Sequence, residues 1–277
     1  MREIENLKES ILKEYPRLNK DSEFQFSCRK DAPCFNDCCG DVNIFLTPYD
    51  VLRLKQRLGI SSGEFLAKYT ISPFDENLKY PVLLLKMSDN EKKNCQFVSD
   101  DGCTVYEDRP WACRMYPLGM ASPGKDNQEL NEEFYFLLKE SICKGFEYDK
   151  KWTVRKWLKD QGIDEYNANG ESFKELTTHK FFIDGSNLPP EKIEMFFMVC
   201  YDLDKFRHFI FDSTFFDKFV VDDDTKSKIK SDDLELLKFG YNWLKFVLFG
   251  EKTMTINQEV VQAKKEEIRK RSESSSN

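Results

Sequence analysis

Residues 34–40 read CFNDCCG, a stretch in which three cysteines fall within six positions and two of them are adjacent. Asn36 before the pair and Gly40 after it are residues typical of turns, so we expect the backbone here to wrap around a bound group. In an extended segment, successive side chains point to opposite faces. The spacing therefore predicts that Cys38 and Cys39 serve two neighbouring centres, or that one of them binds and the other packs.

Other cysteines lie before and after this stretch in the first half of the chain. Eight of the nine cysteines lie within the first 143 residues: Cys28, Cys34, Cys38, Cys39, Cys95, Cys103, Cys113 and Cys143. Thiolates favour zinc or the iron of a cluster over magnesium or calcium, and both metals accept roughly tetrahedral sulfur surroundings. We therefore predict a metal-binding region with all eight cysteines as candidate ligands, enough for two four-cysteine sites.

The second cysteine block, CQFVSDDGCTVYEDRPWACRMYP at residues 95–117, adds two cations to the thiols. Arg109 and Arg114 flank Cys113. Four thiolates on one divalent metal carry about two net negative charges, which cationic neighbours would offset. We therefore predict that Arg109 and Arg114 contact the bound group.

The remaining reactive side chains are predicted to be structural. Cys200 lies on the apolar face of a predicted helix, where a cysteine behaves as a small hydrophobic residue. The histidines, His179 and His208, stand near no pattern that suggests a catalytic triad. The chain also lacks the glycine-rich phosphate-binding motifs, so nothing in it predicts nucleotide binding.

The first half of the chain is predicted to mix short helices with short strands. Thr47 as N-cap, Pro48 at the first helical position and Gly59 as terminator predict one helix, and Ser61 predicts the start of a second. Strands are expected at 80–87, 95–98, 103–106 and 132–138, with an Asp-Gly hairpin turn between the second and third.

The second half of the chain shows long helical patterns. A polar segment at 221–233 is expected to link the last two strong helices, and the tail at 269–277 is too polar to fold alone. The predicted fold class is α+β. An irregular cysteine-rich metal-binding domain with short strands and a helical pair occupies residues 1–150, followed by a mainly helical domain at 151–277 with a disordered tail.

Composition excludes several classes of function. The formal net charge is -7 with both signs mixed along the chain, which argues against a nucleic-acid surface. Residues 1–20 read as an amphipathic helix rather than a signal, and no apolar run is long enough to cross a membrane. We therefore expect a cytoplasmic protein, whose thiols are reduced and need a role other than disulfides.

Two blocks of the sequence resemble the CxxCxxCC cysteine-cluster family, also called the YkgJ family, which is described as zinc- or iron-chelating. They are SCRKDAPCFNDCCGDVNIFLTPYDVLRL at residues 27–54 and CQFVSDDGCTVYEDRPWACRMYPLG at residues 95–119. With Cys143, the resemblance covers residues 24–147 and implies metal binding by the same eight cysteines. The spacing from Cys28 to Cys34 to Cys38 is longer than in the family's tight CxxCxxCC form.

Two classes of function stay open at this point. In the first, the cysteines hold an iron–sulfur cluster, of the 4Fe-4S type, in a redox or protein-modifying protein; flagellin lysine N-methylases carry a similar cysteine pattern. In the second, zinc folds the cysteine domain without catalysis, and the helical half binds a protein substrate or partner.

Overall fold

The computed structural model describes residues 15–73, 78–121, 133–260 and 262. It divides into two compact units, one formed by residues 1–46 and 84–169 and the other by residues 47–83 and 170–277. Helices and short antiparallel strand pairs occur together, so the predicted α+β class is confirmed. The predicted N-terminal helix falls mostly, and the predicted tail wholly, outside the described residues.

The first unit contains short strands and short helices. Its antiparallel pairs are β1 (Glu23–Gln25) with β8 (Lys151–Thr153), β4 (Val98–Ser99) with β5 (Gly102–Cys103), and β6 (Leu118–Ala121) with β7 (Phe134–Leu137). Its other elements are η1 (Asp37–Cys39), β3 (Leu84–Leu85), η2 (Tyr106–Asp108), α4 (Trp111–Met115), η3 (Gly145–Glu147), α5 (Val154–Asp160) and the first part of α6 (Ile163–Thr177). The hairpin predicted around the Asp-Gly turn is therefore present.

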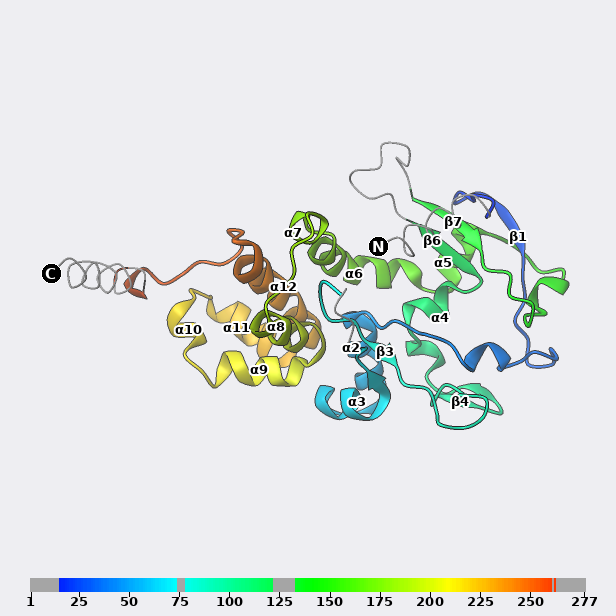
Figure 1. Ribbon diagram of the computed structural model, residues 1–277, viewed down its shortest axis with the longest axis horizontal. Coiled ribbons are helices and arrows are strands. Elements are labelled where there is room, and N and C mark those ends of the chain that lie inside the picture. Colours follow the sequence, from blue (N-terminus) through cyan, green and yellow to red (C-terminus); the bar gives the residue numbers. More distant parts are fainter. Residues whose placement is uncertain (1–14, 74–77, 122–132, 261, 263–277) are drawn as a thin grey trace. The chain divides into compact units, whose positions relative to one another are not determined.

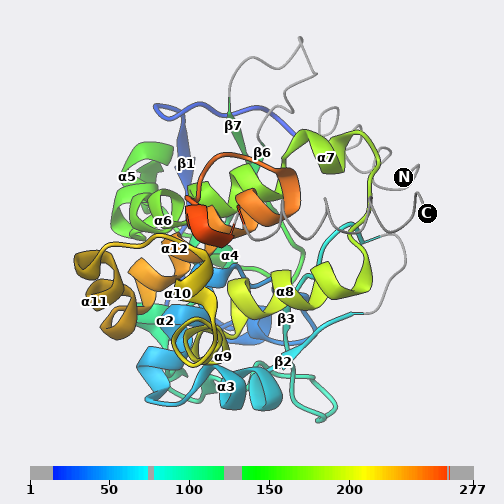
Figure 2. The same cartoon turned by 90° about the vertical axis from the view of Figure 1, so that its left-hand side faces the viewer.

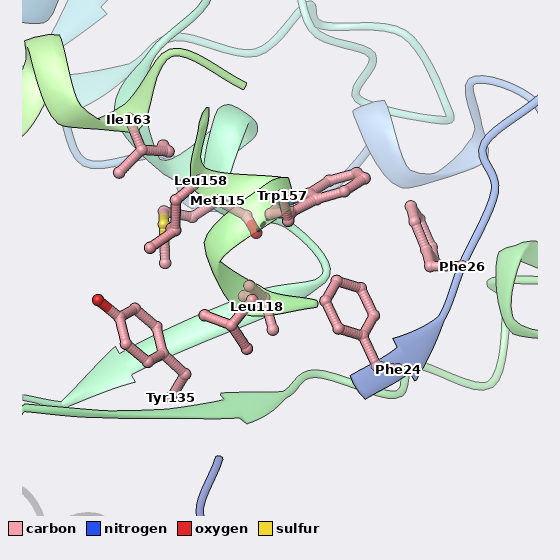
Figure 3. Close-up of a cluster of buried hydrophobic side chains, with 9 residues drawn as sticks. Phe24, Phe26, Met115, Leu118, Tyr135, Trp157, Leu158 and Ile163 are labelled. Atoms are coloured by element: carbon pink, nitrogen blue, oxygen red, sulfur yellow. Dashed lines mark hydrogen bonds between the residues drawn. The ribbon is translucent and has the colours of Figure 1, made fainter. Parts of the chain in front are cut away.

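An apolar cluster holds the first unit together (Figure 3). Its buried members lie in β1, α4, β6, β7, α5 and α6 or, for Phe26, directly after β1: Phe24, Phe26, Met115, Leu118, Tyr135, Val154, Trp157, Leu158 and Ile163. Phe26 and Trp157 meet edge to face, with ring centroids 5.6 Å apart. Tyr116 and Cys143 pack against this cluster, so the core reaches two residues that matter for the site.

The second unit is mainly helical (Figure 1, Figure 2). It contains α2 (Pro48–Leu58), α3 (Ser62–Tyr69), β2 (Thr70–Ile71), the rest of α6, α7 (Lys180–Ile183), α8 (Pro190–Tyr201), α9 (Leu203–Phe211), α10 (Phe215–Lys218), α11 (Asp223–Ser231) and α12 (Asp233–Phe249). Helix α12 packs against α2, α8, α9 and α11. The second unit therefore shares one helical core.

Both helices of the predicted pair, α2 and α3, are present, and each has the N-cap residue that was predicted for it. The Thr47 hydroxyl accepts the Asp50 N–H at 3.1 Å, and the Asp50 carboxylate accepts the Thr47 N–H at 2.7 Å. Gly59 ends the helix at φ 65°, a left-handed conformation that favours glycine. The Ser61 side chain caps the second helix by accepting the Glu64 N–H.

The polar link predicted at 221–233 is wrong, because most of it forms helix α11. The Asp222 carboxylate caps that helix by accepting the Thr225 N–H at 2.8 Å, and Ile229 buries its side chain. One buried side chain leaves too weak an apolar pattern to predict a helix. The strand predicted at 80–87 is also shorter, reduced to Leu84–Leu85.

No helix in the described residues combines the length and the apolar character that crossing a bilayer requires. Cys200 is buried in α8, at 1% exposure, as predicted for a core cysteine.

Candidate metal centre

The CFNDCCG stretch forms a tight loop rather than an extended segment. Asn36 adopts the left-handed conformation at φ 70°, and residues Asp37–Cys39 form a 3-10 turn. The Asn36 side chain donates to the Ser99 carbonyl at 2.8 Å, which fixes the loop to the β4–β5 hairpin. The turn expected from Asn36 and Gly40 is therefore present. Successive side chains in a 3-10 turn diverge by about 120°, so the opposite-facing arrangement of an extended segment does not apply to Cys38 and Cys39.

The eight candidate ligands all belong to the first unit, although they are spread over 116 positions from Cys28 to Cys143. None of them forms a disulfide. Seven are half-buried, and Cys28 is exposed. In the described residues, no three Cys, His, Asp or Glu side chains converge closely enough to hold one metal ion. Metal binding would therefore require the sulfurs to turn toward one another.

Three of the thiols share a local backbone geometry. In each, the N–H two residues downstream donates to the cysteine sulfur: Gly145 to Cys143 at 3.4 Å, Phe97 to Cys95, and Val105 to Cys103. Such bonds favour the thiolate form that binds metals, because they stabilise its negative charge. The sequence predicted a backbone that wraps around a bound group at the double cysteine, but these donors follow three other cysteines.

A long-range bond brings the first cysteine block to the last cysteine. The backbone N–H of Lys144 donates to the Cys34 sulfur at 3.2 Å, across 110 positions. Gly145, the next residue, lies against the Phe26 ring, which a Cβ at this position would overlap. Neither residue was predicted as part of the site, since a backbone donor leaves no mark in the sequence.

The adjacent thiols Cys38 and Cys39 are hydrogen-bonded to each other. The bond from Cys39 lowers the pKa of Cys38 to about 7 in spite of burial. The same bond raises the pKa of Cys39, and burial and the charges of Cys38, Cys95 and Cys113 add to the rise. The hydrogen bond thus favours one thiolate in the pair and disfavours a second.

The other thiols with altered acidity are harder to ionise. Although Cys28 is exposed as a residue, neighbouring atoms desolvate its sulfur, and this, followed by the charges of Cys38, Cys34 and Cys143, raises the pKa of Cys28 to about 11. Burial also raises the pKa of Cys95 and of Cys103. Several thiolates can therefore coexist here only if a cation compensates their charge, so the donor set fits zinc or iron chemically.

The two predicted arginines are buried, at 7% exposure each, and their contacts differ. The guanidinium of Arg109 donates to the Tyr106 carbonyl and to the Gln161 side chain. Its charge offsets part of the burial that raises the pKa of Cys103. All three nitrogens of Arg114 donate to backbone carbonyls, of Arg109, Glu107 and Gln161. Arg109 thus supplies charge beside a thiol, whereas Arg114 holds the loop.

Tyr116 is a site residue that the sequence analysis missed. Its hydroxyl is buried without a hydrogen-bond partner of ordinary geometry in the described part of the chain, and it faces the Cys143 sulfur. Burial and this contact raise the pKa of Tyr116. The Tyr-Pro step after Cys-Arg was visible in the sequence, but nothing in it pointed to a thiol 27 positions away.

The comparisons with known proteins agree with the predicted resemblance. Residues 27–147 match the model of the CxxCxxCC family, described as a putative zinc- or iron-chelating domain. No curated protein and no solved structure gives a significant match to the chain. The first and last cysteines of the site, Cys28 and Cys143, both lie within the matched range.

Proposed function

We propose that this chain, with a zinc- or iron-chelating family match over residues 27–147, is a cytoplasmic protein that holds an iron–sulfur cluster on its cysteines. The proposal is supported by the all-thiol ligand set and by the N–H donors that follow Cys95, Cys103 and Cys143. N–H···S bonds, burial and nearby charge are the means by which proteins tune such clusters. When bound, a cluster supplies one-electron chemistry.

The residues of the chain have separate parts in this proposal. The thiols bind, the backbone N–H groups stabilise their charge, and Arg109 offsets negative charge near Cys103. Arg114 fixes the loop that carries Cys113. A redox or protein-modifying activity would use the cluster that these residues hold. We propose that the helical second unit binds a protein substrate or partner.

Metal and sulfide analysis of anaerobically purified protein tests the proposal. We expect iron and acid-labile sulfide in equal amounts, together with a brown colour that dithionite bleaches. Stoichiometric zinc without iron or sulfide, in a colourless protein, would overturn the cluster and favour zinc with a structural role. Protein that contains neither metal would overturn both.

A further inference from the structure

Two cysteines that are far apart in the sequence, Cys34 and Cys143, hold their sulfurs at one short stretch of backbone. The Lys144 N–H donates to the Cys34 sulfur at 3.2 Å, and the Gly145 N–H donates to the Cys143 sulfur at 3.4 Å. These two N–H groups belong to consecutive residues, so both sulfurs lie beside the same turn of the chain. The first cysteine block and the last cysteine therefore meet at their thiols.

The covalent geometry of the chain limits how far apart the two cysteines can be. The Lys144 nitrogen is bonded to the carbonyl carbon of Cys143, which puts it about 2.4 Å from the Cys143 Cα. The Cys34 sulfur is 3.2 Å from that nitrogen and hence at most about 5.6 Å from the Cys143 Cα. A disulfide joins residues whose Cα atoms are about 4.4–6.8 Å apart. Side-chain rotation with a small backbone shift would therefore bring the two sulfurs together.

Contacts other than those of the sulfurs hold the two segments in place. The Ser27 N–H donates to the Gly145 carbonyl at 2.9 Å, which ties the chain before Cys34 to the turn after Cys143. Gly145 also lies against the ring of Phe26, a buried member of the apolar cluster of the first unit. The approach of the two thiols is thus set by the core and by backbone bonds.

Both thiols are available for reaction with a small molecule. Each is a free cysteine and each is half-buried, so neither is enclosed in a core as Cys200 is. In a compartment that keeps thiols reduced, the disulfides that do form are usually transient and serve catalysis or redox sensing. Two accessible thiols that the fold keeps together meet the requirements for such a disulfide.

We propose that Cys34 and Cys143 form a reversible disulfide when the metal-free chain meets a small-molecule disulfide such as oxidised glutathione. One cysteine thiolate attacks the glutathione disulfide, forms a mixed disulfide and releases one glutathione; the other cysteine then displaces the second. The two cysteine thiols together lose two electrons and two protons, and the glutathione disulfide is reduced to two thiols. The site is therefore redox-sensitive at one defined pair.

The disulfide goes beyond the proposed metal binding, because its formation needs no metal. Its consequence for the site does rest on the proposed function. The thiolate is the form of cysteine that binds metals, so oxidation of the pair removes Cys34 and Cys143 from the eight candidate ligands. Metal binding would then depend on the redox state of the surroundings.

Peptide mapping by mass spectrometry tests the pair. The metal-free, fully reduced, full-length protein is incubated with oxidised glutathione, and the remaining thiols are blocked before digestion. We expect one main cross-link, between the peptides of Cys34 and Cys143, which dithiothreitol reverses. A main cross-link between Cys39 and Cys95, whose backbones are also hydrogen-bonded, would overturn the assignment, as would glutathione retained on both Cys34 and Cys143.

Two single variants show whether the fold selects the pair. Cys34→Ser should lose the cross-link and retain glutathione on Cys143. Cys28→Ser removes an exposed thiol from the same segment and should keep the cross-link. A new link from Cys28 to Cys143 in the Cys34→Ser protein, or loss of the link from Cys28→Ser, would show that the fold does not select Cys34.

Metal analysis of the reduced protein tests the proposed function separately. The cross-link can form in a chain that binds no metal, and metal can bind to a chain whose thiols do not pair. Failure of one proposal therefore leaves the other standing.

Discussion

Single residues around the thiols decide how firmly a metal would be held, and Tyr116 is one of them. Its hydroxyl faces Cys143, and its ring packs edge to face against Phe26 at 5.9 Å. The core therefore fixes the ring while the polar end reaches the sulfur. A hydroxyl in this position can donate a hydrogen bond to a bound thiolate.

Tyr116→Phe should weaken metal binding without changing its stoichiometry. Loss of a hydrogen bond to a ligand costs on the order of tenfold in metal affinity, whereas the ring and its packing are kept. The measurement is a competition titration of Co²⁺ against a chelator. The matched control is Tyr148→Phe, which removes the same hydroxyl from a tyrosine whose ring contacts Arg29. Equal affinities of the two variants would remove Tyr116 from the site.

Arg114 acts on the same region through the backbone. Arg114→Lys should destabilise the protein by about 2 kcal/mol, because a lysine cannot serve three carbonyls that the planar guanidinium reaches together. Thermal unfolding of metal-free protein measures this. Arg155→Lys is the control, because Arg155 pairs with Asp21 at the surface and should unfold like the unmodified chain. A stable Arg114→Lys protein would show that the loop is held by other contacts.

At the scale of elements, the close contact of α12 with its neighbours depends on one glycine. A Cβ at Gly240 would lie 2.5 Å from Val199 in α8 and 3.0 Å from Phe206 in α9. Gly170, in helix α6, would meet nothing within 4 Å. The same substitution therefore has opposite consequences at the two positions.

Gly240→Ala should destabilise the protein by about 1–3 kcal/mol, because a packed core does not accept an extra methyl group. Gly170→Ala should stabilise it by up to about 1 kcal/mol, because alanine favours the helix. Chemical denaturation of both variants checks the pair. Shifts of the same sign would contradict the packing described for α12.

The elements show where sequence reasoning succeeds and where it fails. Helix α2 could be predicted because its caps, Thr47, Asp50 and Gly59, are local and act within one turn. Helix α11 could not, because its polar sequence buries only Ile229 and depends on packing against α12. The eight candidate cysteines were chosen by residue type, and their role as ligands stays a prediction, whereas the backbone donors of Lys144 and Gly145 could not be predicted.

At the scale of the whole molecule, the helical pair belongs to the second unit, although it lies between the two cysteine blocks in sequence. An amphipathic pattern shows that a helix buries one face, but not which core receives it. An ion-pair network ties helix α2 of the helical pair to the other helices of the second unit. Lys55 of α2, at 5% exposure, contacts Asp233 at 2.8 Å and Asp204 at 3.3 Å, and Arg207 contacts Asp233 at 2.5 Å.

This network makes stability depend on pH. Burial alone would raise the pKa of Asp233, but bonds from Arg207 and Lys55 lower it overall. A carboxylate whose pKa is lower in the folded chain than the unfolded value of about 3.9 stabilises the fold above that value. The contribution is lost as the pH falls through the folded pKa.

Asp233→Asn should therefore cost about 3 kcal/mol at neutral pH, since it leaves Lys55 and Arg207 incompletely paired. The difference from the unmodified chain should shrink below about pH 4. Thermal unfolding across this range measures it. Asp224→Asn removes an exposed pair with Lys228 and should change little at any pH. A pH-independent cost for Asp233→Asn would contradict the role of its charge.

The central claim is that the cysteines of the first unit bind metal and that the ninth cysteine, Cys200, does not. Metal content after anaerobic purification, compared between Cys113→Ser and Cys200→Ala, tests it most directly. We expect Cys113→Ser to lose a large part of its bound metal, and Cys200→Ala to keep the full amount because its thiol is buried in the helical core. Equal metal loss from both variants, or none from either, would contradict the assignment.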